Sequence, residues 1–203
     1  ELMEAFSDAG CTVNDIYSSV VPEMTEPDVI SAYEDYVSST YLGIPPEYSE
    51  DIRDYIERNL PDLVGIYGEN DDLMPDSRYL VANQVSNYLR ENYTYSLDGR
   101  NNSRNPVMQF LDDTKRGHCS LYASAMTLIL RELGIPARYC TGFYVEGENG
   151  GGSVLLREKN LHAWVEVYLG EYGWVTFDPT SSSAYPGRTV SDSTTEPDKP
   201  GSC

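Results

Sequence analysis

The sequence has 203 residues, of which 40% are hydrophobic and 11% aromatic. This is enough to bury a sizeable core, so we expect one folded domain, alone or with an appendage. The formal net charge of −19 repels phosphate groups and no basic cluster offsets it, so nucleic acid and anionic membrane surfaces are not expected partners.

The first 60 residues are predicted to be mainly helical, and residues 1–74 to form a helical extension packed on the core. Pro27 suits the first turn of a helix, and the apolar residues of 29–41 recur every three or four positions. The segment GIPPEY then breaks the pattern. Helical spacing resumes after it, and we interpret the following apolar stripe as core packing: Tyr48, Ile52, Tyr55 and Ile56.

The acidic segment 68–77 is predicted to be a solvated loop, because it lacks the spaced ligands and the terminal glutamate of an EF-hand loop; whether it binds calcium is left open. A helix is predicted to follow at 77–93, with Leu80, Gln84 and Tyr88 on one face. Residues 94–106 should form an extended piece and a turn-rich loop.

The segment that begins at Cys119 is apolar nearly all round, which is typical of a central, buried helix. Gly134 and Pro136 are expected to end it. Three strands are predicted next, in ARYCTGFYVEG, HAWVEVYL and GWVTFDPT, with a flexible loop at 147–153. In the second strand, alternate residues are expected to share one side of the sheet: Ala163, Val165 and Val167.

Residues 181–203 are rich in Ser, Thr and Pro and nearly lack aliphatic side chains, so they are predicted to form a disordered linker. No run approaches the roughly 20 apolar residues that span a bilayer, and no signal peptide is visible. Since the sequence starts with Glu1, we expect a fragment or a processed product, in contact with a membrane only through segments outside these residues.

The four cysteines are Cys11, Cys119, Cys140 and Cys203, and no two of them have CxxC spacing. With only two histidines in the chain, a structural zinc site is not expected, and no metal or other cofactor is predicted. Whether Cys11 and Cys203 pair in a disulfide is left open. Cys140 is expected to be a buried structural thiol in a strand.

Cys119 could be a buried thiol, half of a disulfide, a metal ligand or a nucleophile, and its position favours the last. A thiolate forms more readily at a helix N-terminus beside a cationic imidazole. Gly117, just before it, allows tight backbone geometry. The backbone N–H groups of the helix start can also hold the oxyanion of an acyl intermediate.

A cysteine nucleophile needs a base, and the base needs an orienting group. His162 begins the alternating strand, and Asp178 ends the next strand. A hairpin centred at Gly170 places these two residues directly opposite each other on one face of the sheet. A longer loop centred near Glu171 would shift this pairing and need a bulge to restore it. Together, the three residues favour a catalytic site over three unrelated structural roles.

Three segments resemble, in this order, the core of the transglutaminase-like superfamily of cysteine enzymes: NYTYSL with NPVMQFL, GHCSLYASAMTLILRELGIPARYCTGF, and LHAWVEVYLGEYGWVTFDPT. The resemblance covers 78–180 and is closest to the bacterial branch, whose members are often held in the membrane with this domain outside. The stretch YVSSTYLGIPPEYSEDIRDYI also looks like the helical lead-in of that branch. The resemblance implies an α+β, papain-like fold, with the nucleophile at the start of a central helix packed on an antiparallel sheet.

Carried over to this sequence, the resemblance implies that Cys119 is the nucleophile, His162 the general base and acid, and Asp178 the orienting carboxylate. The catalytic core is accordingly predicted at 75–180. All three positions are intact, which argues against the inactive members of the superfamily.

Some features of the family do not transfer. Animal members use a tryptophan upstream of the nucleophile near the oxyanion, but Trp164 and Trp174 both follow it here. Calcium activation is not expected either. His118 either lines the site or stabilises the turn before the helix. The candidate side-chain donors to the oxyanion are Tyr93, Tyr95 and Gln109.

The expected activity is acyl transfer or hydrolysis at a carboxamide or peptide bond of a protein or peptide, through an acyl-thioester. An amine acceptor would make the enzyme a transglutaminase, and water would make it an amidase or protease; the sequence leaves both open, and it leaves the oligomeric state open. The alternative is a non-catalytic cell-envelope binding module that retains the fold. We expect an extracytoplasmic domain of a membrane-anchored bacterial protein.

Overall fold

The computed structural model describes residues 26–64, 75–98, 103–144 and 155–180. Several predicted features lie outside these ranges: the segment before residue 26, most of the acidic segment 68–77, the loop 147–153, the tail 181–203, and Cys11 with Cys203. The structure divides into two compact units, residues 1–43 and residues 44–203, and each is described by itself. The domain boundaries at residues 75 and 181 stay predictions.

The described part of the first unit is helix α3, Glu26–Tyr41, and it confirms the helix predicted after Pro27. The ring of Tyr36 lies 6.2 Å, between centroids, from the rings of Tyr33 and Tyr41. Within the described ranges of the whole chain, no helix combines the length and the apolar character needed to cross a membrane.

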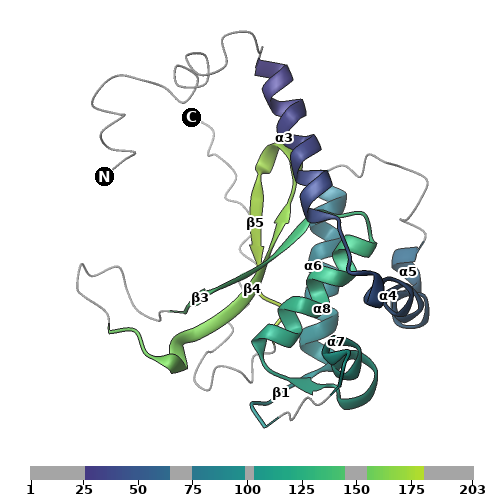
Figure 1. Ribbon diagram of the computed structural model, residues 1–203, viewed down its shortest axis with the longest axis vertical. Coiled ribbons are helices and arrows are strands. Elements are labelled where there is room, and N and C mark those ends of the chain that lie inside the picture. The colour runs from purple at the N-terminus through teal and green to yellow at the C-terminus, as the bar shows by residue number, and fades with distance from the viewer. Residues whose placement is uncertain (1–25, 65–74, 99–102, 145–154, 181–203) are drawn as a thin grey trace, which may run out of the picture. The chain divides into compact units, whose positions relative to one another are not determined.

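Helix α8, Cys119–Glu132, is the central helix of the second unit (Figure 1). Its residues from 121 to 130 are all buried except Ser124, as the sequence predicts. At its end the Ile135 N–H donates to the Leu130 carbonyl at 2.9 Å, and the Gly134 N–H donates to the Arg131 carbonyl at 3.0 Å. This pair of bonds is a Schellman motif, which needs a left-handed residue, and Gly134 has a φ of 66°.

Three further helices contact α8: α4 (Pro46–Asn59), α6 (Pro75–Asn92) and α7 (Pro106–Met108). Helix α5 (Pro61–Val64) follows α4 directly. The stripe predicted for α4 is confirmed, because Ile52, Tyr55 and Ile56 are each at most 2% exposed. These helices cover α8 on the sides that the sheet leaves free.

A cluster of buried hydroxyl groups joins α4 to the rest of this unit. The Tyr55 hydroxyl lies 2.5 Å from the Tyr93 hydroxyl and 3.1 Å from the Tyr88 hydroxyl. The Tyr93 hydroxyl also donates to the Leu111 carbonyl at 2.9 Å. We call Tyr55, Tyr88 and Tyr93 the tyrosine cluster. It satisfies polar groups that burial would otherwise leave without partners.

The buried stripe of α6 is not the one that contains Leu80, Gln84 and Tyr88. Leu80 is 65% exposed, Gln84 is exposed and Tyr88 is half-buried. Helix α6 contacts β5 as well as α8, so tertiary packing selects a stripe one residue further along the helix. The buried residues of this stripe are Val81, Ala82, Val85 and Leu89.

The three predicted strands form one antiparallel sheet in the order β3-β4-β5. Their bounds are Ala137–Phe143 for β3, Leu161–Tyr168 for β4 and Trp174–Phe177 for β5. The predicted alternation is confirmed, since Ala163, Val165 and Val167 are all at most 1% exposed and β4 packs on α8. A central helix on an antiparallel sheet makes the fold α+β, as predicted.

The hairpin between β4 and β5 has a different register from the predicted one. Tyr168 pairs with Trp174 and Val165 with Phe177, so the hairpin is centred at Glu171. The turn contains a short 3-10 helix, η3 (Gly170–Tyr172). A hydrogen bond of 2.8 Å from the Leu169 N–H to the Gly173 carbonyl closes it.

This register corrects the prediction for His162 and Asp178. Because β5 ends at Phe177, Asp178 lies past the end of the strand and is not directly opposite His162. The register is displaced by two residues, and a displacement by an even number keeps side chains on the same face. The two residues are therefore diagonal neighbours, and no bulge is needed to bring them together.

Before α8 the chain forms a second, smaller sheet. Strands β1 (Thr94–Tyr95) and β2 (Arg116–Gly117) are parallel, with Tyr95 paired to Gly117. Between them lie α7 and a π-helix, η1 (Gln109–Thr114). A short 3-10 helix, η2 (Glu158–Asn160), leads into β4. The extended piece predicted after α6 is thus a strand that lies beside the entry to α8.

Candidate active site

Cys119 is the first residue of α8 and is half-buried. His118 precedes it in extended conformation, and its side chain makes no capping hydrogen bond to the helix. The first N–H groups of a helix have no partner within the helix, and the helix dipole favours negative charge at this end. The start of α8 therefore favours the thiolate form of Cys119.

Gly117 brings the chain close to the core just before the helix starts. A Cβ atom at this position would lie 2.7 Å from Leu121 Cδ1 and 2.9 Å from Phe110 Cδ2, so one of these side chains would have to shift to admit it. The predicted role of Gly117 in tight geometry is explained by this close approach, because its φ is not in the left-handed region.

His162 lies one residue after the start of β4, and its side chain is only 8% exposed. Its Nε2 lies 3.0 Å from Asp178 Oδ2, which leaves Nδ1 as the ring nitrogen available to Cys119. The ring of Trp164 lies 6.4 Å from the imidazole, tilted by 23°, and the ring of Tyr144 lies 6.3 Å away. Strand alternation places Trp164 on the His162 face, so the sequence could have identified it as a neighbour.

Asp178 is held from several sides. The Thr180 N–H donates to Oδ1 at 3.0 Å, so Oδ2 is left for His162. The Asp178 carbonyl accepts from the Ser86 hydroxyl at 3.4 Å and from the Arg90 guanidinium, both on α6. Burial raises the pKa of Asp178, but the hydrogen bonds from His162 and Thr180 outweigh it and hold the pKa below its ordinary value. The sequence contains no signal for the contacts from α6.

The surroundings of Cys119 lower the pKa of its thiol. Burial alone raises this pKa, but hydrogen bonds from His118, His162 and the Ala163 backbone lower it to about 6. The His118 side chain is one of the groups that lower this pKa, which favours a place in the site over a role confined to the turn before the helix.

The pKa of His162 changes in the opposite direction. Burial lowers it, but hydrogen bonds to Asp178 and Cys119 and the charges of both raise it to about 9. Near pH 7, Cys119 is therefore mainly a thiolate and His162 mainly an imidazolium. A thiolate is the nucleophilic form of cysteine, and an adjacent imidazolium can donate a proton to a leaving group.

Cys140 lacks the surroundings that lower the pKa of Cys119. It lies in β3, as predicted, but it is half-buried and not fully buried. Its Sγ lies 3.8 Å from the Arg138 carbonyl, and burial raises the pKa of its thiol. Both cysteines within the described ranges are free thiols.

The three candidate donors to an oxyanion have different surroundings in the structure. Tyr93 belongs to the tyrosine cluster and is 4% exposed. Gln109 starts η1, and its Oε1 is buried. Tyr95 is half-buried in β1, and its phenol interacts electrostatically with Cys119. In the described ranges, no group of three or more His, Cys, Asp and Glu residues is arranged to hold a metal ion.

Comparison with known proteins identifies relatives with this core. A family model described as the transglutaminase-like superfamily matches residues 71–179. A Bacillus subtilis protein, "Uncharacterized protein YebA", is 36% identical over 167 residues, which are 79% of this chain and 22% of that protein. A Pseudomonas aeruginosa protein, "Protein-glutamine gamma-glutamyltransferase", is 39% identical over 102 residues, which are 50% of this chain and 15% of that protein.

A solved structure agrees with these sequence relatives. The crystal structure of the periplasmic domain of TgpA from Pseudomonas aeruginosa, bound to ethylmercury, matches with a TM-score of 0.55 and 29% identity, over 71% of this chain and 49% of that one. The chain spans less than a quarter of the length of the two curated relatives. Since the family model covers more than half of the residues, including Cys119, His162 and Asp178, this chain belongs to the transglutaminase-like superfamily.

Proposed function

We propose that this chain is a cysteine enzyme that transfers or hydrolyses an acyl group at a carboxamide or peptide bond of a protein or peptide. Cys119 is the nucleophile, His162 the general acid and base, and Asp178 the carboxylate that orients the imidazole. One observation carries the proposal: a thiol with a pKa of about 6 is hydrogen-bonded to an imidazole with a pKa of about 9, which in turn binds a buried carboxylate.

The reaction follows from these charges. The Cys119 thiolate attacks the carbonyl carbon, and the C=O electron pair moves to oxygen to form a tetrahedral oxyanion. The oxyanion collapses, the C–N bond breaks, and the His162 imidazolium gives its proton to the departing ammonia or amine. The acyl group is then held on Cys119 as a thioester. His162, now neutral, accepts a proton from the incoming acceptor as it attacks.

The acyl donor we favour is the side-chain carboxamide of glutamine in a protein. The relative that is named a protein-glutamine gamma-glutamyltransferase supports this choice. A primary amine as acceptor gives a cross-link or a modified glutamine, and water as acceptor gives glutamate. Both outcomes use the same thioester, so the acceptor is determined by which nucleophile reaches it.

We also propose that the chain is an extracytoplasmic domain of a membrane-anchored bacterial protein. The support is the similarity to the periplasmic domain of TgpA and to a Bacillus subtilis protein more than four times as long as the matched segment. The anchor would belong to segments outside these residues.

The first experiment measures the reactivity of Cys119. The protein is reduced, treated briefly with iodoacetamide at pH 7, and analysed by intact-mass spectrometry with mapping of the adduct. We expect one fast modification that Cys119→Ala removes, that His162→Ala slows, and that the matched control Cys140→Ala leaves unchanged. Equally slow labelling of wild type and His162→Ala would contradict a catalytic Cys119 and favour a binding module.

The second experiment identifies the acceptor. A glutamine-containing peptide is incubated with and without a biotinylated primary amine. Incorporation of the amine, with release of ammonia, identifies a transglutaminase. Conversion of glutamine to glutamate in the presence of the amine identifies an amidase, and cleavage of the peptide chain identifies a protease. If none of these products depends on Cys119, the proposed function is wrong.

A further inference from the structure

The transfer proposed above creates negative charge on the carbonyl oxygen of the substrate when Cys119 attacks. A site that stabilises this oxyanion usually provides more than one hydrogen-bond donor. The Cys119 N–H, at the first turn of α8, is one such donor. The second donor has to be a neighbour of Cys119 that has an O–H or N–H group without another partner.

Tyr93 does not meet this condition. Its ring is 4% exposed, and its hydroxyl donates its hydrogen to the Leu111 carbonyl at 2.9 Å. The same oxygen lies 2.5 Å from the Tyr55 hydroxyl. A hydroxyl group has a single hydrogen, so this one has none left for a substrate.

Gln109 carries a possible donor, because its side-chain amide has an NH2 group beside the buried Oε1. Among the described residues, however, Gln109 makes no interaction with Cys119, whereas the phenol of Tyr95 does. Gln109 is therefore not the neighbour of Cys119 that the condition requires.

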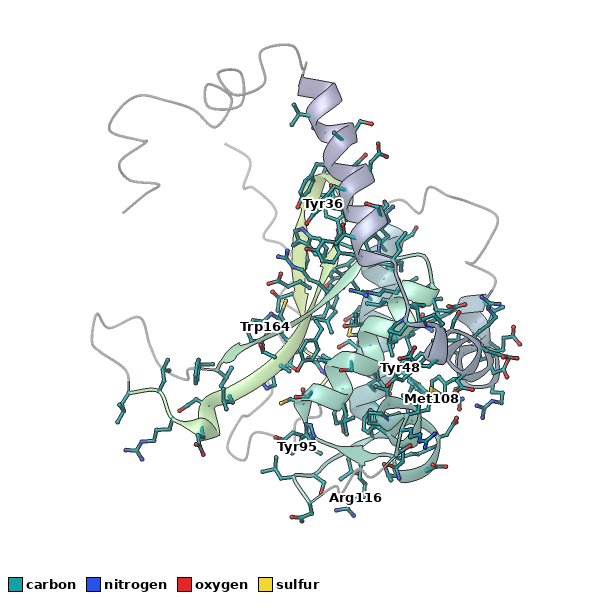
Figure 2. The ribbon with its side chains drawn as sticks, viewed as in Figure 1. Tyr36, Tyr48, Tyr95, Met108, Arg116 and Trp164 are labelled. Atoms are coloured by element: carbon teal, nitrogen blue, oxygen red, sulfur yellow. The ribbon has the colours of Figure 1, made fainter. Side chains whose placement is uncertain are left out.

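Tyr95 is held next to the start of α8. It is paired with Gly117, two residues before Cys119, in the parallel β1–β2 sheet. Two backbone bonds flank it, from the Thr94 N–H to the Lys115 carbonyl at 2.9 Å and from the Ser96 N–H to the Gly117 carbonyl at 2.8 Å. Figure 2 shows Tyr95 beside the first turn of the helix. Its position is therefore coupled to that of the nucleophile.

The hydroxyl of Tyr95 is also in the right chemical state. Tyr95 is half-buried, and its hydroxyl makes no hydrogen bond to another residue within the described ranges. Burial and the negative charge of Cys119 raise the pKa of Tyr95, so the phenol keeps its hydrogen at neutral pH. The electrostatic interaction with Cys119 agrees with the backbone pairing, which places Tyr95 beside the residues that lead into the nucleophile.

We infer that the Tyr95 hydroxyl donates the second hydrogen bond to the oxyanion formed when Cys119 attacks the substrate. This inference rests on the proposed function. It makes Tyr95 a catalytic residue that contacts the reacting oxygen, while the Cys119 N–H contacts the same oxygen from the helix start. No covalent bond to Tyr95 forms, and its proton stays on the phenol throughout.

Two reactions of the same sulfur test this role. Iodoacetamide alkylates Cys119 by displacing iodide, and no oxyanion forms. p-Nitrophenyl acetate acylates Cys119 through an oxyanion and releases p-nitrophenolate. In Tyr95→Phe we expect the acylation rate to fall by about 10²-fold, as for the loss of one oxyanion donor, while the alkylation rate stays within about twofold of wild type. The matched control Tyr139→Phe, on exposed Tyr139 of β3, should change neither rate.

The other outcomes overturn the inference in distinguishable ways. Equal acylation by wild type and Tyr95→Phe would show that Tyr95 is not a donor, while the proposed function would stand. An equal fall of both rates would show that Tyr95 only supports the structure around Cys119. Failure of wild type to be acylated at Cys119 at all would refute the proposed function, and the role of Tyr95 with it. Far-ultraviolet circular dichroism of each variant shows that the rates refer to folded protein.

Discussion

His162 Nε2 and Asp178 Oδ2 lie 3.0 Å apart, although Asp178 has already left the strand that pairs with β4. The carboxylate is not positioned by the β-ladder. Its backbone carbonyl is held by Ser86 and Arg90 of α6, and its second oxygen by the Thr180 N–H. Helix α6 therefore fixes the backbone of the residue whose carboxylate binds the imidazole.

Replacing the Asp178 carboxylate with an amide should weaken the interaction between His162 and Cys119. In Asp178→Asn the charge that raises the pKa of His162 is lost, so this pKa falls and the thiolate of Cys119 loses its cationic partner. We expect kcat/KM to fall by about 10²–10⁴-fold, the usual contribution of general acid-base catalysis. The pH midpoint of iodoacetamide labelling should move above its wild-type value near 6.

A suitable control is Asp112→Asn, which removes an exposed carboxylate that pairs with Arg58 at 3.2 Å. Labelling of Cys119 in this variant should match wild type. Unchanged labelling in Asp178→Asn would mean that Asp178 does not tune the site.

The activity should be bell-shaped in pH. Below about pH 6 the thiol of Cys119 is protonated and cannot attack, and above about pH 9 the imidazolium of His162 has lost the proton that the leaving group needs. We expect kcat/KM to have its maximum between these limits. His162→Ala should move the labelling midpoint of Cys119 upward, because a hydrogen bond and a charge that stabilise the thiolate are removed. A wild-type labelling midpoint close to that of an ordinary thiol would contradict this account.

Gly117→Ala should destabilise the protein. The added methyl group would collide with Leu121 Cδ1 at 2.7 Å and Phe110 Cδ2 at 2.9 Å, and overpacking of this kind costs about 1–3 kcal/mol. The free energy of unfolding, measured by urea titration, tests this. Gly43→Ala is the matched control, since its added Cβ meets no atom within 4 Å, and it should be nearly neutral. A neutral Gly117→Ala would mean that β2 shifts easily.

Tyr93→Phe should lower stability without altering the chemistry of the site. The buried hydroxyl bonds to the Leu111 carbonyl and the Tyr55 hydroxyl, and leaving such partners unsatisfied costs about 1–3 kcal/mol. The unfolding midpoint in urea measures this loss. Tyr172 is 62% exposed, so the control Tyr172→Phe should not lower the stability comparably. A large drop in the acylation rate of folded Tyr93→Phe would show that Tyr93, and not Tyr95, serves the oxyanion.

Much of the core could be predicted because each element carries its own signal. The apolar run after Cys119 predicts a buried helix, and Gly134 marks its end through a left-handed φ. The alternation from His162 onward predicts a strand with one buried face. These signals are local, so they do not depend on what the segments pack against.

The parts that could not be predicted depend on contacts between distant segments. In the β4–β5 turn both Gly170 and Gly173 have positive φ, so the sequence LGEYG allows either of two centres. On α6, the stripe of Leu80 and the stripe of Val81 are both plausible, and only the contacts with α8 and β5 select the second. The hydrogen bond from Arg90 to the Asp178 carbonyl joins residues that are 88 positions apart, and no pattern in either segment predicts it.

The tyrosine cluster implies that the segment matched by the family model is shorter than the segment that the fold needs. The family match begins at residue 71, yet Tyr55 of α4 places its hydroxyl against those of Tyr88 and Tyr93 inside the core. A recombinant fragment trimmed to the matched residues would lack α4, and the core surface that α4 covers would be exposed to solvent. Truncation for expression, or transplantation of this activity into another protein, should therefore begin no later than Ile44.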